Sequence, residues 1–135
     1  MFSEHERAYL TAQPLLRLAT VASDGQPTVD AVIFEFDGQQ FYISGLDLPA
    51  TRKYRNVARG NRQVALIIDD LKTRQPWQPR GIKVHGTAEI VERDGRFGRK
   101  EYLAITPVVS WSWGITGTDY EQGAFKPHKI VWTEA

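Results

Sequence analysis

The chain has 135 residues with 17 basic and 16 acidic side chains, and its formal net charge is +1. This near balance argues against a general nucleic-acid-binding protein, whose surface is normally dominated by basic residues. Cysteine is absent, which excludes disulfides, thiolate metal ligands and a cysteine nucleophile. The charged N-terminus does not resemble a signal peptide and no apolar run approaches about 18 residues, so we expect a soluble, cytoplasmic protein with one domain over residues 1–135.

The first third of the chain is predicted to form a helix followed by strands. Residues 4–12 are predicted to form a short helix, because Ser3 and Glu6 have the spacing of a capping box. Asp-Gly turn dipeptides at residues 24–25 and 37–38 separate apolar, β-branched segments. These segments are predicted strands over residues 15–23, 27–36 and 40–44. Two such turns in series indicate an antiparallel meander.

A basic segment interrupts this β pattern. Pro49 suits the first turn of a helix, and Gly60 suits the position just after a helix ends. Between them, three arginines recur at helical spacing on one face and three apolar or aromatic residues on another: Arg52, Arg55 and Arg59, and Tyr54, Val57 and Ala58. The segment is therefore predicted to be an amphipathic helix of two to three turns.

The remaining chain is predicted to be mostly β structure. Residues 71–81 contain Pro76, Trp77 and Pro79 and are predicted to form a long loop. Strands are predicted before and after it, over residues 63–70, 82–92, 102–106, 108–115 and 128–132. Six or seven antiparallel strands and two short helices, without a parallel βαβ rhythm, indicate a mainly β fold. A closed or partly closed β-barrel would hide the strand edges.

The start of the basic helix is a candidate anion site. Thr51, Arg52 and Lys53 place a hydroxyl and two cations where a helix leaves backbone N–H groups free. Together these groups could hold a phosphate. The alternative is a solvated basic helix face, which is common on protein surfaces.

Other polar residues give weaker signals. His5, His85 and His128 are scattered without ligand spacing, so no metal site is expected. Asp69 and Asp70 end a strand, where carboxylates could act as acid and base but more often turn outward.

Two further features concern the last strands. Trp111 and Trp113 are predicted to share one face of a strand. Their indoles would pack in the core or in a dimer, or they would form a platform for a ligand. Gly86 in a regular strand indicates a bulge or a close approach by a backbone or ligand, with Arg80 and Lys83 adding cations near the start of that strand.

The order of these segments resembles a known superfamily over nearly the whole chain. The anchors are FYIS at residues 41–44, TRK at 51–53, NRQVALIIDD at 61–70 and RGIKVHGTAE at 80–89. They are similar to the split β-barrel flavin and deazaflavin oxidoreductases, the superfamily of pyridoxamine 5′-phosphate oxidase. The resemblance implies a six- to seven-stranded antiparallel split β-barrel of the FMN-binding type.

Two departures from the oxidase branch bear on the cofactor. Its second strand carries an arginine and a lysine that hold the flavin, whereas Asp30 and Glu35 stand near those positions here. The glutamine expected after Arg80 is Gly81. Both departures fit better with the relatives that use the deazaflavin coenzyme F420. FMN is the alternative cofactor.

The resemblance also implies an activity and an assembly. We expect an F420-dependent oxidoreductase that transfers a hydride between the reduced cofactor and a small electron-poor organic acceptor. The alternatives are an FMN-dependent oxidase or reductase and a non-catalytic flavin- or deazaflavin-binding protein. In the relatives two chains form a homodimer with the cofactor at the interface. No membrane or nucleic-acid partner is expected.

The resemblance assigns cofactor contacts but no catalytic residue and no metal ligand. The cofactor phosphate would meet Thr51, Arg52 and Lys53, with Arg55 or Arg59 reaching a polyanionic tail. The ring would run near Ser44, Arg80 and Lys83, and Trp111 or Trp113 of the partner subunit would close over it. Acceptor selectivity would depend on loops at residues 71–81 and 114–127.

Overall fold

The structure is a computed structural model that describes residues 1–115 and 127–132. The chain begins with helix α1 (Glu4–Ala12), as the capping box predicts. The Ser3 hydroxyl accepts a hydrogen bond from the backbone N–H of Glu6 at 3.1 Å, and the Glu6 carboxylate accepts one from the N–H of Ser3 at 2.9 Å. The helix buries Tyr9 and Leu10 on the side that faces the sheet.

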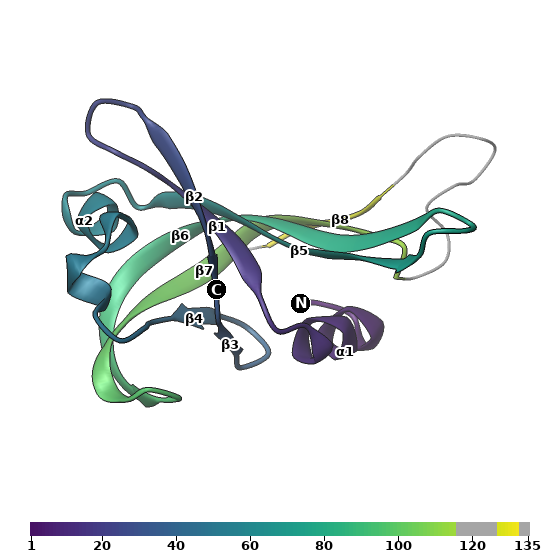
Figure 1. Cartoon of the computed structure of the whole chain (residues 1–135), viewed down its shortest axis with the longest axis horizontal. Coiled ribbons are helices and arrows are strands. Elements are labelled where there is room, and N and C mark those ends of the chain that lie inside the picture. The colour runs from purple at the N-terminus through teal and green to yellow at the C-terminus, as the bar shows by residue number, and fades with distance from the viewer. Residues whose placement is uncertain (116–126, 133–135) are drawn as a thin grey trace.

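Over the described part of the chain, eight antiparallel strands form one sheet that curls into a barrel (Figure 1). Their order is β2-β1-β5-β6-β7-β4-β3, and β8 pairs with β7 beside this path. The strands are β1 (Leu16–Val21), β2 (Pro27–Val32), β3 (Glu35–Phe36), β4 (Phe41–Ile43), β5 (Gln63–Thr73), β6 (Gln78–Gly95), β7 (Gly98–Trp113) and β8 (His128–Val131). The predicted mainly β, split-barrel fold is confirmed, with eight strands in place of six or seven.

The predicted single strand over residues 27–36 is divided in two. Strand β2 pairs with β1 at one end of the sheet path, whereas β3 pairs with β4 at the other end. Ile33 and Phe34 carry the chain from one end of the sheet path to the other. The two Asp-Gly turns are confirmed, because they connect β1 to β2 and β3 to β4, with Gly25 and Gly38 at φ of 90° and 100°.

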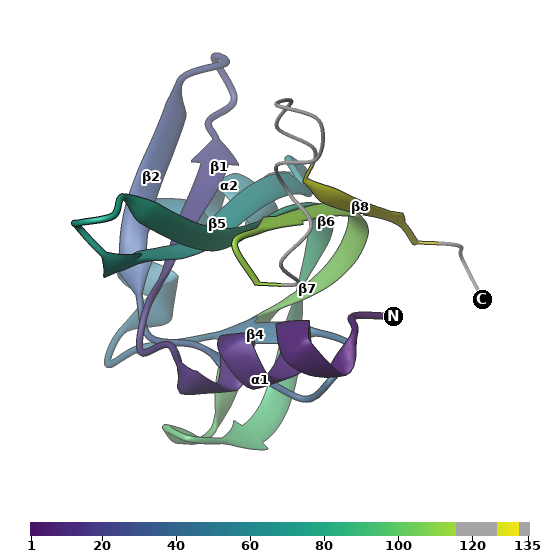
Figure 2. The same cartoon turned by 90° about the vertical axis from the view of Figure 1, so that its right-hand side faces the viewer.

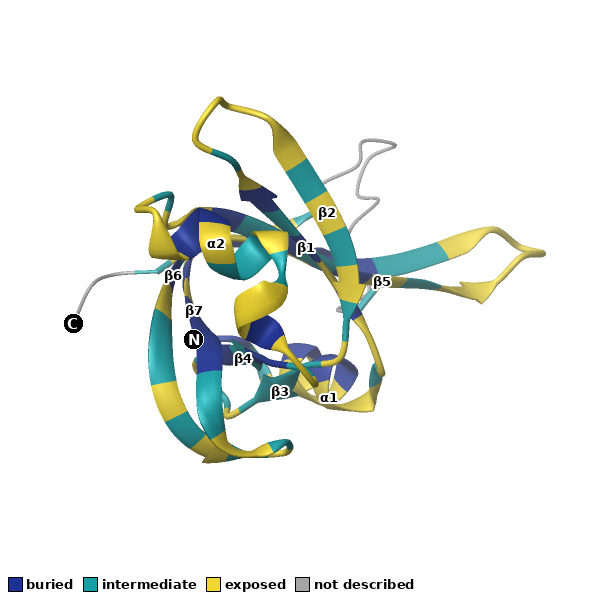
Figure 3. Cartoon of the chain, turned by 60° about the vertical axis from the view of Figure 1, so that its left-hand side comes forward, coloured by how far each residue is buried: buried dark blue, intermediate teal, exposed yellow. Residues whose placement is uncertain are grey.

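Strands β5, β6 and β7 are longer than the sequence predicts. Strand β5 runs to Thr73 and β6 starts at Gln78, so most of the predicted loop over residues 71–81 is a hairpin that projects from the barrel (Figures 1 and 3). The predicted break before residue 108 is also wrong, since β7 continues through Pro107. A bulge at this point pairs Gly86 with Pro107 and His85 with Val109, which leaves Val108 as the extra residue.

Of the alternatives predicted for Gly86, the structure shows both a bulge and a close approach by a neighbouring backbone. A Cβ atom at this position would lie 2.6 Å from the carbonyl oxygen of Thr106, which is closer than side-chain carbons normally come to a backbone oxygen. The glycine therefore lets β6 and β7 remain in contact across the bulge.

Helices lie at both openings of the barrel. Helix α1 crosses the opening that faces the viewer in Figure 2, and α2 (Arg52–Ala58) lies at the other end. Pro49 belongs to a separate 3-10 turn, η1 (Leu48–Ala50), so α2 has only seven residues. The buried core between them contains side chains from five strands, including Leu18, Phe41, Leu66, Val84 and Ile105.

Candidate functional site

A hollow beside α2 brings together three of the predicted cofactor residues. Ser44, Thr51 and Lys53 line it, together with Val32 at the end of β2 and Ile33 directly after it. Its volume is about 280 Å³. Leu48 of η1 and Lys53 of α2 line the hollow on the side of the basic helix. We call this cavity the phosphate hollow.

The two hydroxyl groups in the phosphate hollow already have partners. Thr51 is the N-cap of α2, so its hydroxyl accepts a hydrogen bond from the N–H of Tyr54 at 3.4 Å and donates one to the carbonyl of Leu48 at 2.6 Å. The Ser44 hydroxyl donates to the carbonyl oxygen of Glu101 at 2.9 Å. Both residues therefore shape the hollow, and an anion there would depend on the cations.

Among the described residues that line the phosphate hollow, Lys53 carries a positive charge and Asp47 a negative one. The ammonium nitrogen of Lys53 lies 3.9 Å from a carboxylate oxygen of Asp30, a loose ion pair, and only 12% of the lysine side chain is exposed. Arg52 is exposed next to it, and Arg55 donates to the carbonyl of Ala50 at 3.4 Å. A phosphate would gain charge-assisted hydrogen bonds from Lys53 and Arg52, so these side chains fit the phosphate end of a flavin or deazaflavin.

Lys83 and Trp111 meet on the outer face of the sheet. The Lys83 ammonium lies 4.6 Å from the centre of the Trp111 ring, and the Lys129 ammonium lies 6.0 Å from it. Cross-strand pairing places these residues in one row over six strands. We call it the lysine row: Ala31, Arg17, Ile67, Lys83, Trp111 and Lys129. Sequence reasoning found Lys83 and Trp111 but missed Lys129.

Trp113 lies against Gly81, its cross-strand partner. A Cβ atom on Gly81 would be 2.5 Å from Cζ2 and 2.9 Å from Cε2 of the indole. The indole thus fills the space in which the glutamine of the oxidase branch would place its side chain. A side chain at position 81 and the indole of Trp113 therefore compete for the same space.

The structure pairs Arg80 with an internal partner instead of leaving it free. Its guanidinium donates two hydrogen bonds to the Asp70 carboxylate, at 3.0 and 2.7 Å, and lies 5.1 Å from the centre of the Tyr9 ring. Arg80 lines a different hollow, of about 330 Å³, beside α1. Arg80 is not among the described residues that line the phosphate hollow, and its contact with the cofactor stays a prediction.

The pKa shifts in this group follow from its contacts. The hydrogen bonds from Arg80 lower the pKa of Asp70, and the hydroxyl of Tyr9 adds to this effect from 2.8 Å. Burial raises the pKa of Tyr9, and its hydrogen bond to Asp70 raises it further. Asp70 is thus an ionised anchor between α1 and the sheet, which agrees with the structural alternative for this residue.

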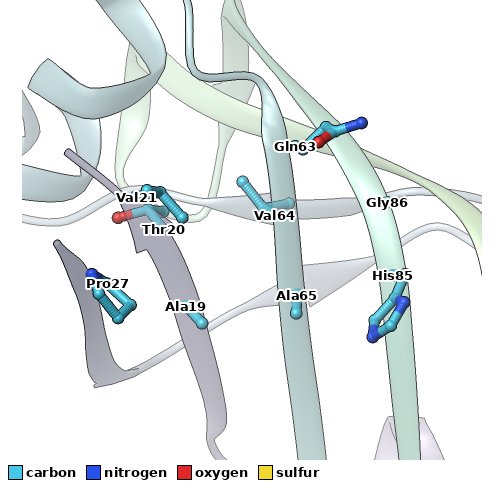
Figure 4. A pocket seen from close by; sticks show the side chains of 9 residues that line it. All are labelled: Ala19, Thr20, Val21, Pro27, Gln63, Val64, Ala65, His85 and Gly86. Carbon is cyan, nitrogen blue, oxygen red and sulfur yellow. The ribbon is translucent and has the colours of Figure 1, made fainter. Parts of the chain in front are cut away.

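A second row on the outer face contains small and apolar side chains. We call it the alanine row: Val29, Ala19, Ala65, His85, Val109 and Val131. At its middle lies a hollow of about 360 Å³, lined by Ala19, Ala65, His85 and their neighbours (Figure 4). Sequence reasoning missed this hollow, because it depends on which residues of β1, β5 and β6 stand opposite one another.

Two further findings concern the described residues as a set. In residues 1–115 and 127–132, no group of three or more histidines and carboxylates could hold a metal ion. No helix in this part of the chain is long and apolar enough to span a bilayer. The predicted selectivity loop at residues 114–127 lies for the most part outside the described residues.

Comparisons with known proteins agree with the split-barrel fold. The chain matches the family described as pyridoxamine 5′-phosphate oxidase over residues 2–122. It is 39% identical over 122 residues to a 5a,11a-dehydrotetracycline/5a,11a-dehydrooxytetracycline reductase of Streptomyces rimosus, covering 86% of this chain and 85% of that protein.

Solved structures share the fold at lower identity. A structure named F420 Reductase has a TM-score of 0.64 at 24% identity, over 82% of this chain and 98% of that one. A conserved hypothetical protein of Mycobacterium tuberculosis has a TM-score of 0.66 at 22% identity, over 84% of this chain and 85% of that one. With the match over residues 2–122 and the reductase relative, the chain belongs to the pyridoxamine 5′-phosphate oxidase family and is an oxidoreductase on its split barrel.

Proposed function

We propose that the protein is an F420-dependent reductase of electron-poor, conjugated organic acceptors. The observation that carries the proposal is the phosphate hollow, a cavity that Lys53 lines together with the end of β2, residues 44–47 and η1, and that has the exposed Arg52 next to Lys53 in sequence. When bound, reduced F420 supplies a hydride to the acceptor, and the protein supplies binding and orientation. The name of the 39% identical relative, a reductase of dehydro compounds, supports this direction of the reaction and this type of acceptor.

Two positions support F420 over FMN. Glu35 stands near a position where the oxidase branch binds flavin with a basic residue, and here it pairs with Arg93 at 3.2 Å and accepts from the N–H of Arg96 at 3.0 Å. Gly81 lies against the indole of Trp113 and has no side-chain amide to offer the cofactor ring. The fold shared with a structure named F420 Reductase is in keeping with this choice.

The residues have distinct proposed roles. Lys53 and Arg52 hold the phosphate, while Thr51 and Ser44 fix the shape of its hollow through their own hydrogen bonds. Arg55 reaches an anionic tail. Lys83 and Trp111 contact the ring system from the lysine row.

We also propose a cytoplasmic homodimer with the cofactor at its interface. What supports the dimer is the outer face of the sheet, on which Trp111 and Trp113 stand and Val29 and Val131 are 65% and 64% exposed. A second copy would cover this apolar surface.

The test is a fluorescence titration of the purified protein with F420 and with FMN, using its four tryptophans as reporters. We expect F420 to bind at least tenfold more tightly. Tighter binding of FMN would overturn the choice of cofactor. Binding of F420 without oxidation of its reduced form by any conjugated enone or quinone would support the non-catalytic alternative.

A further inference from the structure

The β6–β7 hairpin, at the lower left of Figure 1, forms one wall of the phosphate hollow. Phe97, in the turn between the two strands, lines the cavity together with residues 44–48 and Lys53. The backbone N–H of Phe97 donates to the hydroxyl of Tyr102 at 3.0 Å, and this hydroxyl donates to the carbonyl of Gly98 at 3.0 Å. The turn is thus held by the strand that follows it.

The opposite wall leaves the sheet next to this hairpin. The last pair between β4 and β7 is Ile43 with Leu103. Beyond this pair, a side chain of β7 bonds to the backbone that leaves the sheet. The Lys100 ammonium donates to the carbonyl of Gly45 at 2.9 Å and to that of Leu46 at 3.5 Å. Lys100 therefore connects the hairpin to the segment that lines the hollow.

Packing contributes little to the position of this segment. The side chain of Leu46 is 93% exposed, and nothing lies within 4 Å of the Cβ position at Gly45. A backbone segment with so few contacts opens easily unless hydrogen bonds hold it. The shape of this wall therefore depends on the two bonds from Lys100.

Lys100 also changes the charge at the hollow. The lining holds one cation, Lys53, and one anion, Asp47, and Lys53 is further offset by its loose pair with Asp30 at 3.9 Å. The partners of Lys100 are neutral carbonyls. In the part of the chain that the structure describes, no carboxylate lies within 4.0 Å of its ammonium. The full positive charge of Lys100 is thus present beside a lining whose own charges nearly cancel.

We infer that Lys100 is a positioning residue for the cofactor phosphate. It binds the carbonyl oxygens of Gly45 and Leu46, whose partial negative charge would otherwise repel an anion, and it adds a positive charge to this wall. The inference rests on the proposed function, because the anion is the phosphate of F420. Sequence reasoning missed Lys100, since it is far from residues 51–53 in the chain and reaches the hollow only through the pairing of β4 with β7.

The experiment compares Lys100→Met, which keeps the length of the side chain but removes its charge and hydrogen bonds, with Lys100→Arg, which keeps both. Arg99→Met is the matched control, because it removes one charge from the neighbouring exposed position, where the arginine pairs with Glu92 at 3.1 Å. Each variant is titrated with F420 and with the same deazaflavin carrying its ribityl chain but no phosphate or tail. Thermal unfolding measures the stability of each variant.

We expect Lys100→Met to bind F420 at least fivefold more weakly and the phosphate-free deazaflavin within twofold of wild type. Lys100→Arg and Arg99→Met should stay within twofold for both ligands. A loss confined to F420 distinguishes positioning at the phosphate from general damage to the fold, which would weaken both ligands. Unchanged F420 affinity in Lys100→Met, an equal loss for the two ligands, or an equal loss in Arg99→Met would overturn the inference.

Inorganic phosphate, as a third probe, separates this inference from the proposed function. The backbone amide signals of Gly45 and Leu46 report its binding by NMR. If wild type does not bind F420 but binds phosphate in a way that Lys100→Met weakens, the proposed function is wrong and Lys100 still positions an anion. If wild type binds F420 and Lys100→Met changes neither ligand, only the inference is wrong. If wild type binds neither F420 nor phosphate, both are wrong.

Discussion

At the scale of single residues, the side chains of the site differ in how strongly the fold already engages them. Thr51 and Ser44 use their hydroxyl protons on backbone carbonyls, whereas Arg52 is exposed and Lys53 has only a loose partner at 3.9 Å. Residue type and position could be read from the sequence, because TRK opens a helix. The partners could not, since Leu48, Glu101 and Asp30 become neighbours only through the tertiary fold.

The first prediction concerns the two cations. Arg52→Ala with Lys53→Ala should weaken F420 binding at least tenfold and flatten its salt dependence, because ionic contacts near the surface are screened by salt. Fluorescence titrations at several salt concentrations measure both effects. The matched control is Lys72→Ala with Arg74→Ala, which removes the same charges from the exposed β5–β6 hairpin. Equal loss of affinity in both variants would mean that only net charge matters.

The second prediction concerns Gly81. Gly81→Gln should lower the free energy of unfolding by about 1–3 kcal/mol, because its Cβ would collide with the Trp113 indole at 2.5 Å. Thermal unfolding followed by circular dichroism measures the loss.

Two variants complete this test. Gly81→Gln with Trp113→Ala should recover part of the stability, and Gly45→Gln should have little effect because nothing lies within 4 Å of its Cβ position. Equal destabilisation by Gly81→Gln with and without Trp113 would show that the two positions are not coupled.

At the scale of elements, the sequence correctly predicts the features that depend on residues adjacent in the chain. The capping box of α1 and the two Asp-Gly hairpins are confirmed, because each depends on residues adjacent in sequence. Residues 71–81 and Pro107 were misleading, because exposed strands do not alternate in polarity and a bulge accommodates a proline. The division of residues 27–36 depends on pairing with two distant strands, which no local pattern encodes.

The third prediction belongs to the contact between α1 and β8. Glu6 is 1% exposed, and its carboxylate lies 3.2 Å from Nδ1 of His128. Burial alone would raise the pKa of Glu6, but contacts with Ser112, Ser3 and His128 together lower it. Because the pKa is lower in the folded state, the carboxylate stabilises the fold above its ordinary value of 4.5 and loses this effect as the pH falls through the lowered value.

Glu6→Gln should therefore lower the Tm at pH 7 by about 4 °C or more, since it disrupts buried hydrogen bonds. The Tm of this variant should also fall less between pH 5 and pH 3 than that of wild type. Scanning calorimetry over this range measures both. Glu4→Gln, an exposed change in the same helical turn, is the control. A parallel decline of the Tm in wild type and Glu6→Gln would contradict the assignment.

At the scale of the whole molecule, the family and fold could be predicted, but the faces of the barrel could not. Segments such as FYIS and RGIKVHGTAE occur in the same order as in the split-barrel superfamily that the chain resembles. This order was enough to predict the split barrel. The alanine and lysine rows each draw one residue from each of six strands, so they exist only after the complete register is set.

The fourth prediction concerns assembly. The protein should sediment as a dimer, and Val29→Glu with Val131→Glu should shift it toward the monomer, because buried charges without partners oppose association. Leu15→Glu, at an exposed apolar residue outside the rows, is the control. Sedimentation velocity over a range of protein concentrations distinguishes the species. A wild-type protein that remains monomeric at high concentration would contradict the proposal.

The crossing from β2 to β3 has a consequence for how this barrel can change over evolution. Hairpin tips such as residues 24–25 and 74–77 end in solvent, so insertions there lengthen a loop and leave the sheet intact. Ile33 and Phe34 instead span the two ends of the sheet path, and Phe34 packs against the core. An insertion between them would lengthen this two-residue seam and displace Phe34 from its packing against the core. Descendants of this chain can therefore acquire new loops at the hairpin tips, while the two-residue seam keeps its length.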